Sequence, residues 1–310
     1  MILYILKKKN INSNKLSQNK IESNIKNLLS NNKDEFFGVR DILYDDEKIY
    51  ITAIIKNNNG FTLNVFEADL NLDYLNFSTF FEKKEFSKNY TIQTGGRLES
   101  YQKNKILLSF GAAESLKNER VQSDDYLEGK IISIDKSSRK YEIISKGHRN
   151  PQGLFFSNNL NLIINSEHGP KGGDEINFNF RDNKKKEIIN FGWPIASYGK
   201  EYDGSDPYKK SHSRYGFEEP FKNYTPSIGI SEILLLQDNK IFDSKSIVVS
   251  SLRAGSIYVL NLNEDLSKIV SEDRIFFGDQ RIRDIKYDEE LNAIIFINEI
   301  TPSIGVINFN

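Results

Sequence analysis

Hydrophobic residues in this chain fall into short runs that alternate with polar residues and come in pairs. Alternating runs of Ile, Val, Leu, Phe and Tyr between turn-forming residues are typical of β-strands with one buried face. Five such pairs recur along the chain: 48–55 with 61–70, 105–110 with 129–135, 160–165 with 174–180, 246–250 with 255–262, and 293–298 with 303–309. Repeated strand-only units predict an all-β fold built from propeller blades, and a β-sandwich is the weaker alternative.

The first residues of the chain depart from this repeat. Residues 2–10 look like the last strand of a blade whose earlier strands are missing. The following residues have the spacing of one apolar helix face: Leu16, Ile21, Ile25, Leu28 and Leu29. We therefore predict an N-terminal strand with a helical or loop insertion over 1–37 and a propeller domain over 38–310.

Composition narrows the functional classes. A hydrophobic fraction of 38% supports a real core, and a net charge of −1 gives no electrostatic basis for binding nucleic acid. No apolar run approaches the ~20 residues of a membrane span. The chain has no cysteine, so disulfides and Cys-bound metals are excluded. An apolar patch precedes the first lysines, the reverse of a secretory signal, so we predict no export signal and leave the localisation open.

Residues 147–199 hold the densest candidate chemistry. They read GHRNPQGL, SEHGPKGGDEIN and NFGWPIASYG between strand-like runs, and they include His148, His168 and the only tryptophan, Trp193. Loops on a regular scaffold concentrate binding and catalytic groups. Tight turns that need Gly and Pro are the alternative for any one segment, but three in succession favour a functional face. His212 lies in no motif and is predicted to be a surface residue.

With GDQRIRDI at 278–285, these motifs resemble the soluble glucose/sorbosone dehydrogenase family, and within it the aldose sugar dehydrogenases that use pyrroloquinoline quinone. The resemblance covers residues 38–310. It implies a six-bladed β-propeller, here with an incomplete first blade, which carries the quinone over its central face with calcium beneath it. It further implies a small-molecule sugar or quinone ligand. Members of the family are often periplasmic or secreted. A homodimer is one alternative for the oligomeric state, which the sequence leaves open.

The quinone carries carboxylates, which guanidinium groups bind bidentately. By motif match, the resemblance places these residues at the cofactor: Gln122, Arg149, Asn150, Asp174, Arg253, Arg281 and Arg283. The RIRD spacing puts Arg281 and Arg283 on one face of a strand. A surface ion pair is the alternative for each arginine taken alone.

The GPKGGDE loop resembles a calcium site. Calcium prefers oxygen ligands, including carbonyls that tight turns aim inward. The resemblance implies that the backbone carbonyls of Gly169 and Pro170 hold the cofactor-linked ion and that Glu175 binds a separate structural calcium.

The resemblance breaks at the catalytic base. The family has a histidine at the start of an H-x-G-G-R-L motif, which removes the sugar hydroxyl proton. Here the motif begins with Gln93 and continues through Leu98. An amide has no useful basicity near neutral pH, which leaves His168 as the alternative base.

Two functions follow from these residues. The first is a divergent propeller that binds a sugar or quinone-type ligand on its central face, with dehydrogenase turnover impaired by Gln93. The alternative is an active quinone-dependent aldose dehydrogenase that oxidises sugar C1 to the lactone. A purely structural propeller fits less well, because it would not need the motif arginines.

Overall fold

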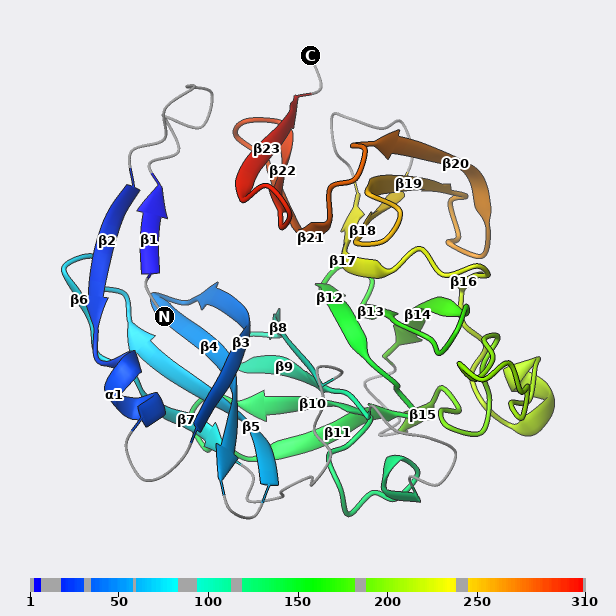
Figure 1. Ribbon diagram of the computed structural model, residues 1–310, viewed down its shortest axis with the longest axis horizontal. Coiled ribbons are helices and arrows are strands. Elements are labelled where there is room, and N and C mark those ends of the chain that lie inside the picture. The colour runs from blue at the N-terminus through cyan, green and yellow to red at the C-terminus, as the bar shows by residue number, and fades with distance from the viewer. Residues whose placement is uncertain are drawn as a thin grey trace.

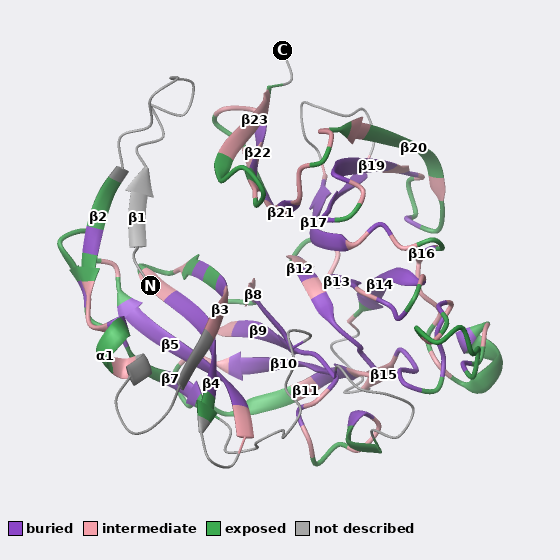
Figure 2. Ribbon diagram, viewed as in Figure 1, coloured by how far each residue is buried: buried purple, intermediate pink, exposed green. Residues whose placement is uncertain are grey.

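The computed structural model describes residues 3–6, 18–30, 35–57, 60–82, 94–112, 119–181, 188–237 and 245–308. Small antiparallel sheets are arranged around a centre, as in a propeller (Figure 1). Buried residues run along the strands between neighbouring sheets, whereas an edge strand such as β20 (Ile269–Phe276) is mostly exposed (Figure 2). No helix in the described ranges is both long and apolar enough to cross a membrane.

Five of the sheets are blades, and each runs outward from one inner strand. Blade 1 contains β3 (Glu35–Asp45), β4 (Lys48–Asn57), β5 (Gly60–Asp69) and β7 (Ser78–Glu82). Blade 2 contains β8 (Gly95–Tyr101), β9 (Lys105–Phe110), β10 (Lys130–Asp135), β11 (Tyr141–Lys146) and the short parallel β15 (Ile189–Asn190).

The remaining blades follow in chain order. Blade 3 contains β12 (Pro151–Ser157), β13 (Leu162–Glu167), β14 (Asp174–Phe180) and β16 (Lys222–Tyr224). Blade 4 contains β17 (Ile230–Leu236), β18 (Ser246–Ser251), β19 (Ser256–Leu262) and β20. Blade 5 contains β21 (Ile282–Asp288), β22 (Ala293–Asn298) and β23 (Ser303–Asn308). Short 3-10 turns occupy Glu119–Val121 and His212–Tyr215.

The prediction of paired strands is confirmed, because each predicted pair forms adjacent antiparallel strands of one blade. The prediction of six blades is wrong, since the described residues form five. The N-terminal strand β1 (Leu3–Leu6) pairs with β2 (Gln18–Ser23), and β2 pairs with β6 (Tyr74–Leu75), as a separate three-stranded sheet (Figure 1).

Hydrophobic burial explains where this small sheet lies. Ile21 and Ile25 are buried in one cluster with Ile51 and Phe66 of blade 1. The opposite face of blade 1 packs against blade 2. The small sheet therefore covers the face of blade 1 that has no blade beside it. The predicted helix shrinks to α1 (Ile25–Ser30), because residues 18–23 pair as a strand instead.

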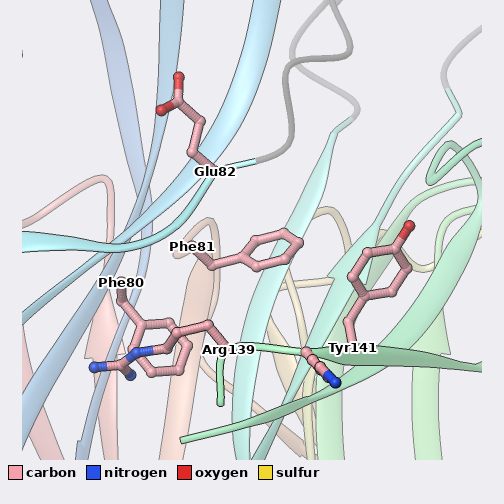
Figure 3. A pocket seen from close by; sticks show the side chains of 6 residues that line it. Phe80, Phe81, Glu82, Arg139 and Tyr141 are labelled. Carbon is pink, nitrogen blue, oxygen red and sulfur yellow. The ribbon is translucent and has the colours of Figure 1, made fainter. Parts of the chain in front are cut away.

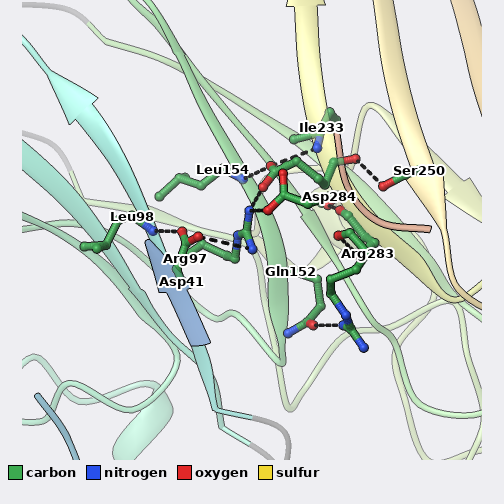
Figure 4. A network of polar contacts seen from close by, with 12 residues as sticks. Asp41, Arg97, Leu98, Gln152, Leu154, Ile233, Ser250, Arg283 and Asp284 are labelled. Carbon is green, nitrogen blue, oxygen red and sulfur yellow. Dashed lines mark hydrogen bonds and ion pairs between the residues drawn. The ribbon is translucent and has the colours of Figure 1, made fainter. Parts of the chain in front are cut away.

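The inner strands meet around one buried guanidinium, that of Arg97 on β8 (Figure 4). Its Nη2 lies 3.1 Å from Asp284 Oδ2 of β21, and its Nη1 lies 3.4 Å from Asp41 Oδ1 of β3. Arg97 also forms an ion pair with Glu232 of β17. Glu232 Oε1 accepts a hydrogen bond from the Leu154 backbone N–H of β12 at 3.2 Å. All five blades are thus connected through one polar cluster.

A β-bulge interrupts each inner strand near this cluster. The pairing register shifts at Val39/Asp41, Gly95/Leu98, Pro151/Gly153, Ile230/Ile233 and Ile282/Asp284. A bulge leaves a residue out of the ladder and re-aims its side chain. The inner strands therefore present polar side chains near the propeller centre.

We predict that Arg97→Met destabilises the fold strongly, since it leaves the buried Asp41 and Glu232 and the partly buried Asp284 without their cation. Removing one partner of a buried ion pair costs about 3–5 kcal/mol of unfolding free energy. Urea denaturation measures the change. The control is Arg120→Met, because Arg120 is an exposed partner of Glu128 and should change stability by less than about 1 kcal/mol. Equal effects of the two substitutions would contradict the central role of Arg97.

Candidate functional site

A cavity of about 210 Å³ opens where the loops of blades 3 and 4 meet. It lies among the segment before β12, the β13–β14 loop, and the segments that flank β17 and β18. The cavity brings together six of the residues predicted from sequence: Arg149, His168, Gly169, Pro170, Asp174 and Arg253. Lys171 and Tyr202 also line it, and Tyr202 is a residue that sequence reasoning missed, because it lies in no motif.

Asp174 links the loops that form the cavity walls through hydrogen bonds to their backbone. Its Oδ2 accepts hydrogen bonds from the backbone N–H groups of Gly229 and Ile230 at 2.8 and 3.0 Å. Its Oδ1 accepts from Gly169 N at 3.3 Å. The loop between these residues turns tightly at Gly173 (φ 69°), where an added Cβ would lie 2.3 Å from Gly199 N. The carboxylate of Asp174 therefore fixes backbone positions rather than facing the cavity unpaired.

Arg149 also binds the loop. Its Nη1 donates to the carbonyl oxygens of His168 and Gly169 at 3.1 and 2.6 Å, and its guanidinium lies 5.3 Å from the centre of the Trp193 ring. Its Nε is buried without a hydrogen-bond partner. With Arg253 and Lys171 on the same cavity and Asp174 as the carboxylate, the lining carries excess positive charge. Such a lining favours an anionic ligand.

His168 is held in one orientation by Ile230. Its Nε2 lies within hydrogen-bonding distance of the Ile230 carbonyl oxygen. Because a carbonyl only accepts, Nε2 carries the proton and Nδ1 the lone pair. Burial lowers the pKa of His168, and the charges of Arg149 and Arg283 lower it further, against an opposing effect of Asp174. His168 is therefore a weak base in this position.

A buried network beneath the cavity was not predicted. His148 Nδ1 lies 2.9 Å from Glu167 Oε1, and its Nε2 lies 2.8 Å from Ser145 Oγ. Glu167 also accepts from the backbone N–H of Arg149 at 2.6 Å and from Asn177 Nδ2 at 2.7 Å. His148 lies in the GHRNP motif and Glu167 begins the EHGP motif, so their motif position was the available signal. The network sets the position of Arg149 from below.

The prediction that His212 is a surface residue is wrong. The side chain is 1% exposed, stacks on Tyr198 with ring centres 5.4 Å apart, and lies 3.7 Å from Glu175 Oε1. Burial lowers the pKa of His212. Glu175 is buried as well, and burial together with the charge of Glu167 raises its pKa well above the usual range. These two side chains lie in the interior beside the cavity.

The remaining predicted residues do not line this cavity and lie in different parts of the structure. Gln122 donates to the Trp193 carbonyl at 2.6 Å and exchanges hydrogen bonds with Asn190, so both ends of its amide bind protein. Asn150 Oδ1 accepts from Gly95 N at 3.3 Å. Arg281 and Arg283 both pair with Glu299 at 2.9–3.1 Å. Gln93 lies outside the described residues.

The predicted calcium ligands, the Gly169 and Pro170 carbonyls and Glu175, already have surroundings of their own. The Gly169 carbonyl accepts a hydrogen bond from the Arg149 guanidinium, and burial raises the pKa of Glu175, which disfavours the ionised carboxylate that a hard cation prefers. Within the described ranges, no three Asp, Glu or His side chains converge as a metal site. Calcium could use this loop only if Arg149 moved away, so the calcium site stays a prediction.

A second hollow lies far from this region, between blades 1 and 2 (Figure 3). It is lined by Phe80, Phe81 and Glu82 of β7 and by Arg139, Lys140 and Tyr141 near β11. Phe81 and Tyr141 pack edge to face with ring centres 5.8 Å apart. None of the residues predicted from the motifs lies there.

Residues 8–302 match the family model described as Glucose / Sorbosone dehydrogenase. The aldose sugar dehydrogenase of Escherichia coli (strain K12) is 31% identical over 208 residues, which is 62% of this chain and 53% of that protein. Quinoprotein glucose dehydrogenase B of Acinetobacter calcoaceticus is 46% identical over 57 residues, which is 18% of this chain and 10% of that protein. The chain therefore matches about half, or less, of the length of these curated relatives.

Solved structures share the fold. A glucose dehydrogenase crystal structure superposes with a TM-score of 0.72 at 23% identity, covering 88% of this chain and 82% of its own. The soluble aldose sugar dehydrogenase of Escherichia coli in its apo-form gives 0.71 at 24% identity, covering 84% and 78%. The PQQ domain of pyranose dehydrogenase from Coprinopsis cinerea gives 0.62 at 10% identity, covering 87% and 92%. At these identities the likeness establishes the propeller architecture.

We predict that Glu175→Gln changes how stability depends on pH. A carboxyl whose pKa is raised on folding contributes stability that is present below its unfolded pKa and is lost as pH rises through the folded value. The glutamine cannot ionise. The variant should therefore gain melting temperature relative to the native chain as the buffer changes from about pH 5 to about pH 8.

The control for this measurement is Glu264→Gln, because the Glu264 side chain is 96% exposed. Its melting temperature should follow that of the native chain at both pH values. Asp41, whose pKa burial raises to about 6, is present in all three proteins and cancels in the comparison. Parallel curves for Glu175→Gln and the native chain would show that Glu175 is ionised in the folded state.

Proposed function

The chain belongs to the glucose/sorbosone dehydrogenase family, and on this premise we propose that it binds a sugar or quinone-type ligand on its central face while its dehydrogenase turnover is impaired. The observation that carries the proposal is the cavity with its unneutralised cations, Arg149, Lys171 and Arg253. At about 210 Å³ it is smaller than the ~300–1,000 Å³ of usual small-molecule pockets, so the ligand would extend over the open face.

Pyrroloquinoline quinone suits this lining, and two of the similar proteins are a quinoprotein glucose dehydrogenase and the PQQ domain of a pyranose dehydrogenase. The buried, unpartnered Nε of Arg149 is a donor that a carboxylate of such a ligand could accept from. Arg149 and Arg253 would hold the cofactor, with Lys171 nearby. When bound, the quinone supplies a hydride acceptor. Asp174 would act indirectly, by holding the loops in place.

The base is the missing part of the chemistry. Oxidation of a sugar hydroxyl requires a group that accepts its proton, and a positioned general base contributes about 10²–10⁴-fold in rate. Gln93 has no such basicity. The Nδ1 atom of His168 carries a lone pair that can accept a proton. Burial and the nearby arginines, however, lower the pKa of His168 and so disfavour its protonated form. Ligand binding can therefore persist where turnover fails.

An active aldose dehydrogenase is the second candidate, favoured by the lone pair of His168 at the cavity. It would need His168 to accept the sugar proton despite its low pKa. This candidate predicts a pH–rate profile with an acidic limb governed by His168, whereas the first predicts little or no turnover.

We predict that the native chain oxidises aldoses weakly or not at all with quinone and calcium supplied, and that Gln93→His raises the rate. A dye-linked oxidation assay compares the two proteins, and a gain of about 10²-fold or more is expected for a base restored in the right place. His168→Gln serves as the control in both backgrounds. Robust native turnover that His168→Gln abolishes would establish the active dehydrogenase and overturn the first proposal.

Calcium enters this proposal only together with the quinone. Because the Arg149 guanidinium occupies the Gly169 carbonyl, calcium alone should not raise the melting temperature, whereas calcium added with the quinone should. Differential scanning fluorimetry with each additive tests this, with magnesium as the control cation. A rise with calcium alone that is lost in Glu175→Gln would instead reveal a separate site at Glu175.

A further inference from the structure

Three inner strands carry a polar residue at the same structural position, the extra residue of a β-bulge. This residue is Arg40 in β3, Gln152 in β12 and Arg283 in β21. In each case the flanking residues pair with consecutive residues of the neighbouring strand, so the extra one is left outside the ladder. Arg40 is therefore the counterpart, on blade 1, of an arginine that the family motif assigns to the ligand.

Two of these bulge residues already meet. Arg283 Nη1 donates to Gln152 Oε1 at 3.3 Å, and the two side chains lie together beside the Arg97 cluster (Figure 4). Gln152 Nε2 in turn donates to Asn150 Oδ1 at 3.1 Å. Asp41 and Asp284, which follow Arg40 and Arg283 in the chain, both contact the Arg97 guanidinium, so the two bulge arginines flank one cluster.

Arg40 differs from its counterpart because no carboxylate neutralises it. Arg283 pairs with Glu299, but Arg40 forms no ion pair within the described ranges. Its Nε is buried without a hydrogen-bond partner. Burial lowers the pKa of Arg40, and the positive charge of Arg283 lowers it further. The guanidinium nonetheless stays protonated, since its ordinary pKa lies far above neutrality.

The backbone beside Arg40 is shaped to admit its side chain. Gly96 of the G-G-R motif adopts φ 94°, and a Cβ added there would lie 2.7 Å from Arg40 Cβ. The stem of Arg40 thus packs against the glycine that follows the Gln93 position by three residues. Arg40 therefore lies on the inner strand of blade 1 beside the G-G-R motif of blade 2, not on an outer edge.

We propose that Arg40 and Arg283 form an anion-binding subsite that receives a carboxylate or phosphate group of the ligand. Two guanidinium groups held near each other repel, and an anionic oxygen group between them removes the repulsion while accepting charge-assisted hydrogen bonds. The inference rests on the proposed function, because it uses the same central face. It names the ligand chemistry: an acidic sugar such as a uronate, or the carboxylate of a bound quinone.

The test is calorimetric titration of the full chain with glucuronate, glucose, inorganic phosphate and pyrroloquinoline quinone. The variants are Arg40→Gln and Arg40→Lys, and the matched control is Arg120→Gln, which removes an equal charge from an exposed site. We expect Arg40→Gln to weaken binding of an anionic probe at least about tenfold and Arg40→Lys to weaken it less, because one charge-assisted bond is worth about that factor. Glucose binding and the Arg120→Gln control should stay unchanged.

The outcomes separate the two sources of the anion and the two proposals. A loss confined to glucuronate and phosphate identifies an acidic sugar, and a loss confined to the quinone identifies a cofactor carboxylate. If the native chain binds glucuronate through Arg40 but no quinone, the subsite stands and the quinone part of the proposed function fails. Unchanged binding of every anion in Arg40→Gln, an equal loss for glucose, or no anion bound by the native chain would overturn the subsite. Should Arg40→Gln not fold, the same comparison is made with Arg40→Lys.

Discussion

The rest of this structure depends on the buried ion pairs at the propeller centre. Carboxylates from three blades, Asp41, Glu232 and Asp284, share the single guanidinium of Arg97. Buried charges are tolerated only when partners and hydrogen bonds compensate the loss of hydration. The carboxylates find these in Arg97 and in the backbone N–H groups of Leu98, Leu154 and Ile233. The inner strands must therefore hold their bulges in register for the cluster to be satisfied.

The same demand explains which charges are left for a ligand. Asp174 and Glu167 already accept hydrogen bonds from backbone N–H groups, and Glu299 pairs with both Arg281 and Arg283. The cations Arg149 and Arg253 line the cavity, and Arg40 lies on the inner strand of blade 1. The carboxylates thus bind backbone or other side chains in the interior. The arginines that have no carboxylate partner among the described residues lie toward the central face, which is therefore positively charged.

Scaffold and catalytic group are physically separable in such a site. The bulges, the Asp174 loop and the His148–Glu167 network depend on backbone geometry and burial of described residues, whereas the replaced base is a single side-chain position, Gln93. Replacing a base by an amide removes proton transfer without disturbing these contacts. The family scaffold and the catalytic base therefore make separate demands on the sequence.

The sequence by itself determined the strand pairs and the family, because alternation with period two is a local property and the Gly- and Pro-rich motifs are contiguous. It also determined the set of polar residues around the cavity, since Arg149, His168 and Asp174 lie within one stretch. Only the tertiary structure decided how many blades form, since Ile21 and Ile25 bury themselves on blade 1 instead of completing another. It alone decided the burial of His212, the engagement of Gln122 with Trp193 and the partners of Arg97. Arg97 and Asp284 are 187 residues apart in the chain, and contacts over such distances follow from how the blades pack, not from any pattern along one strand.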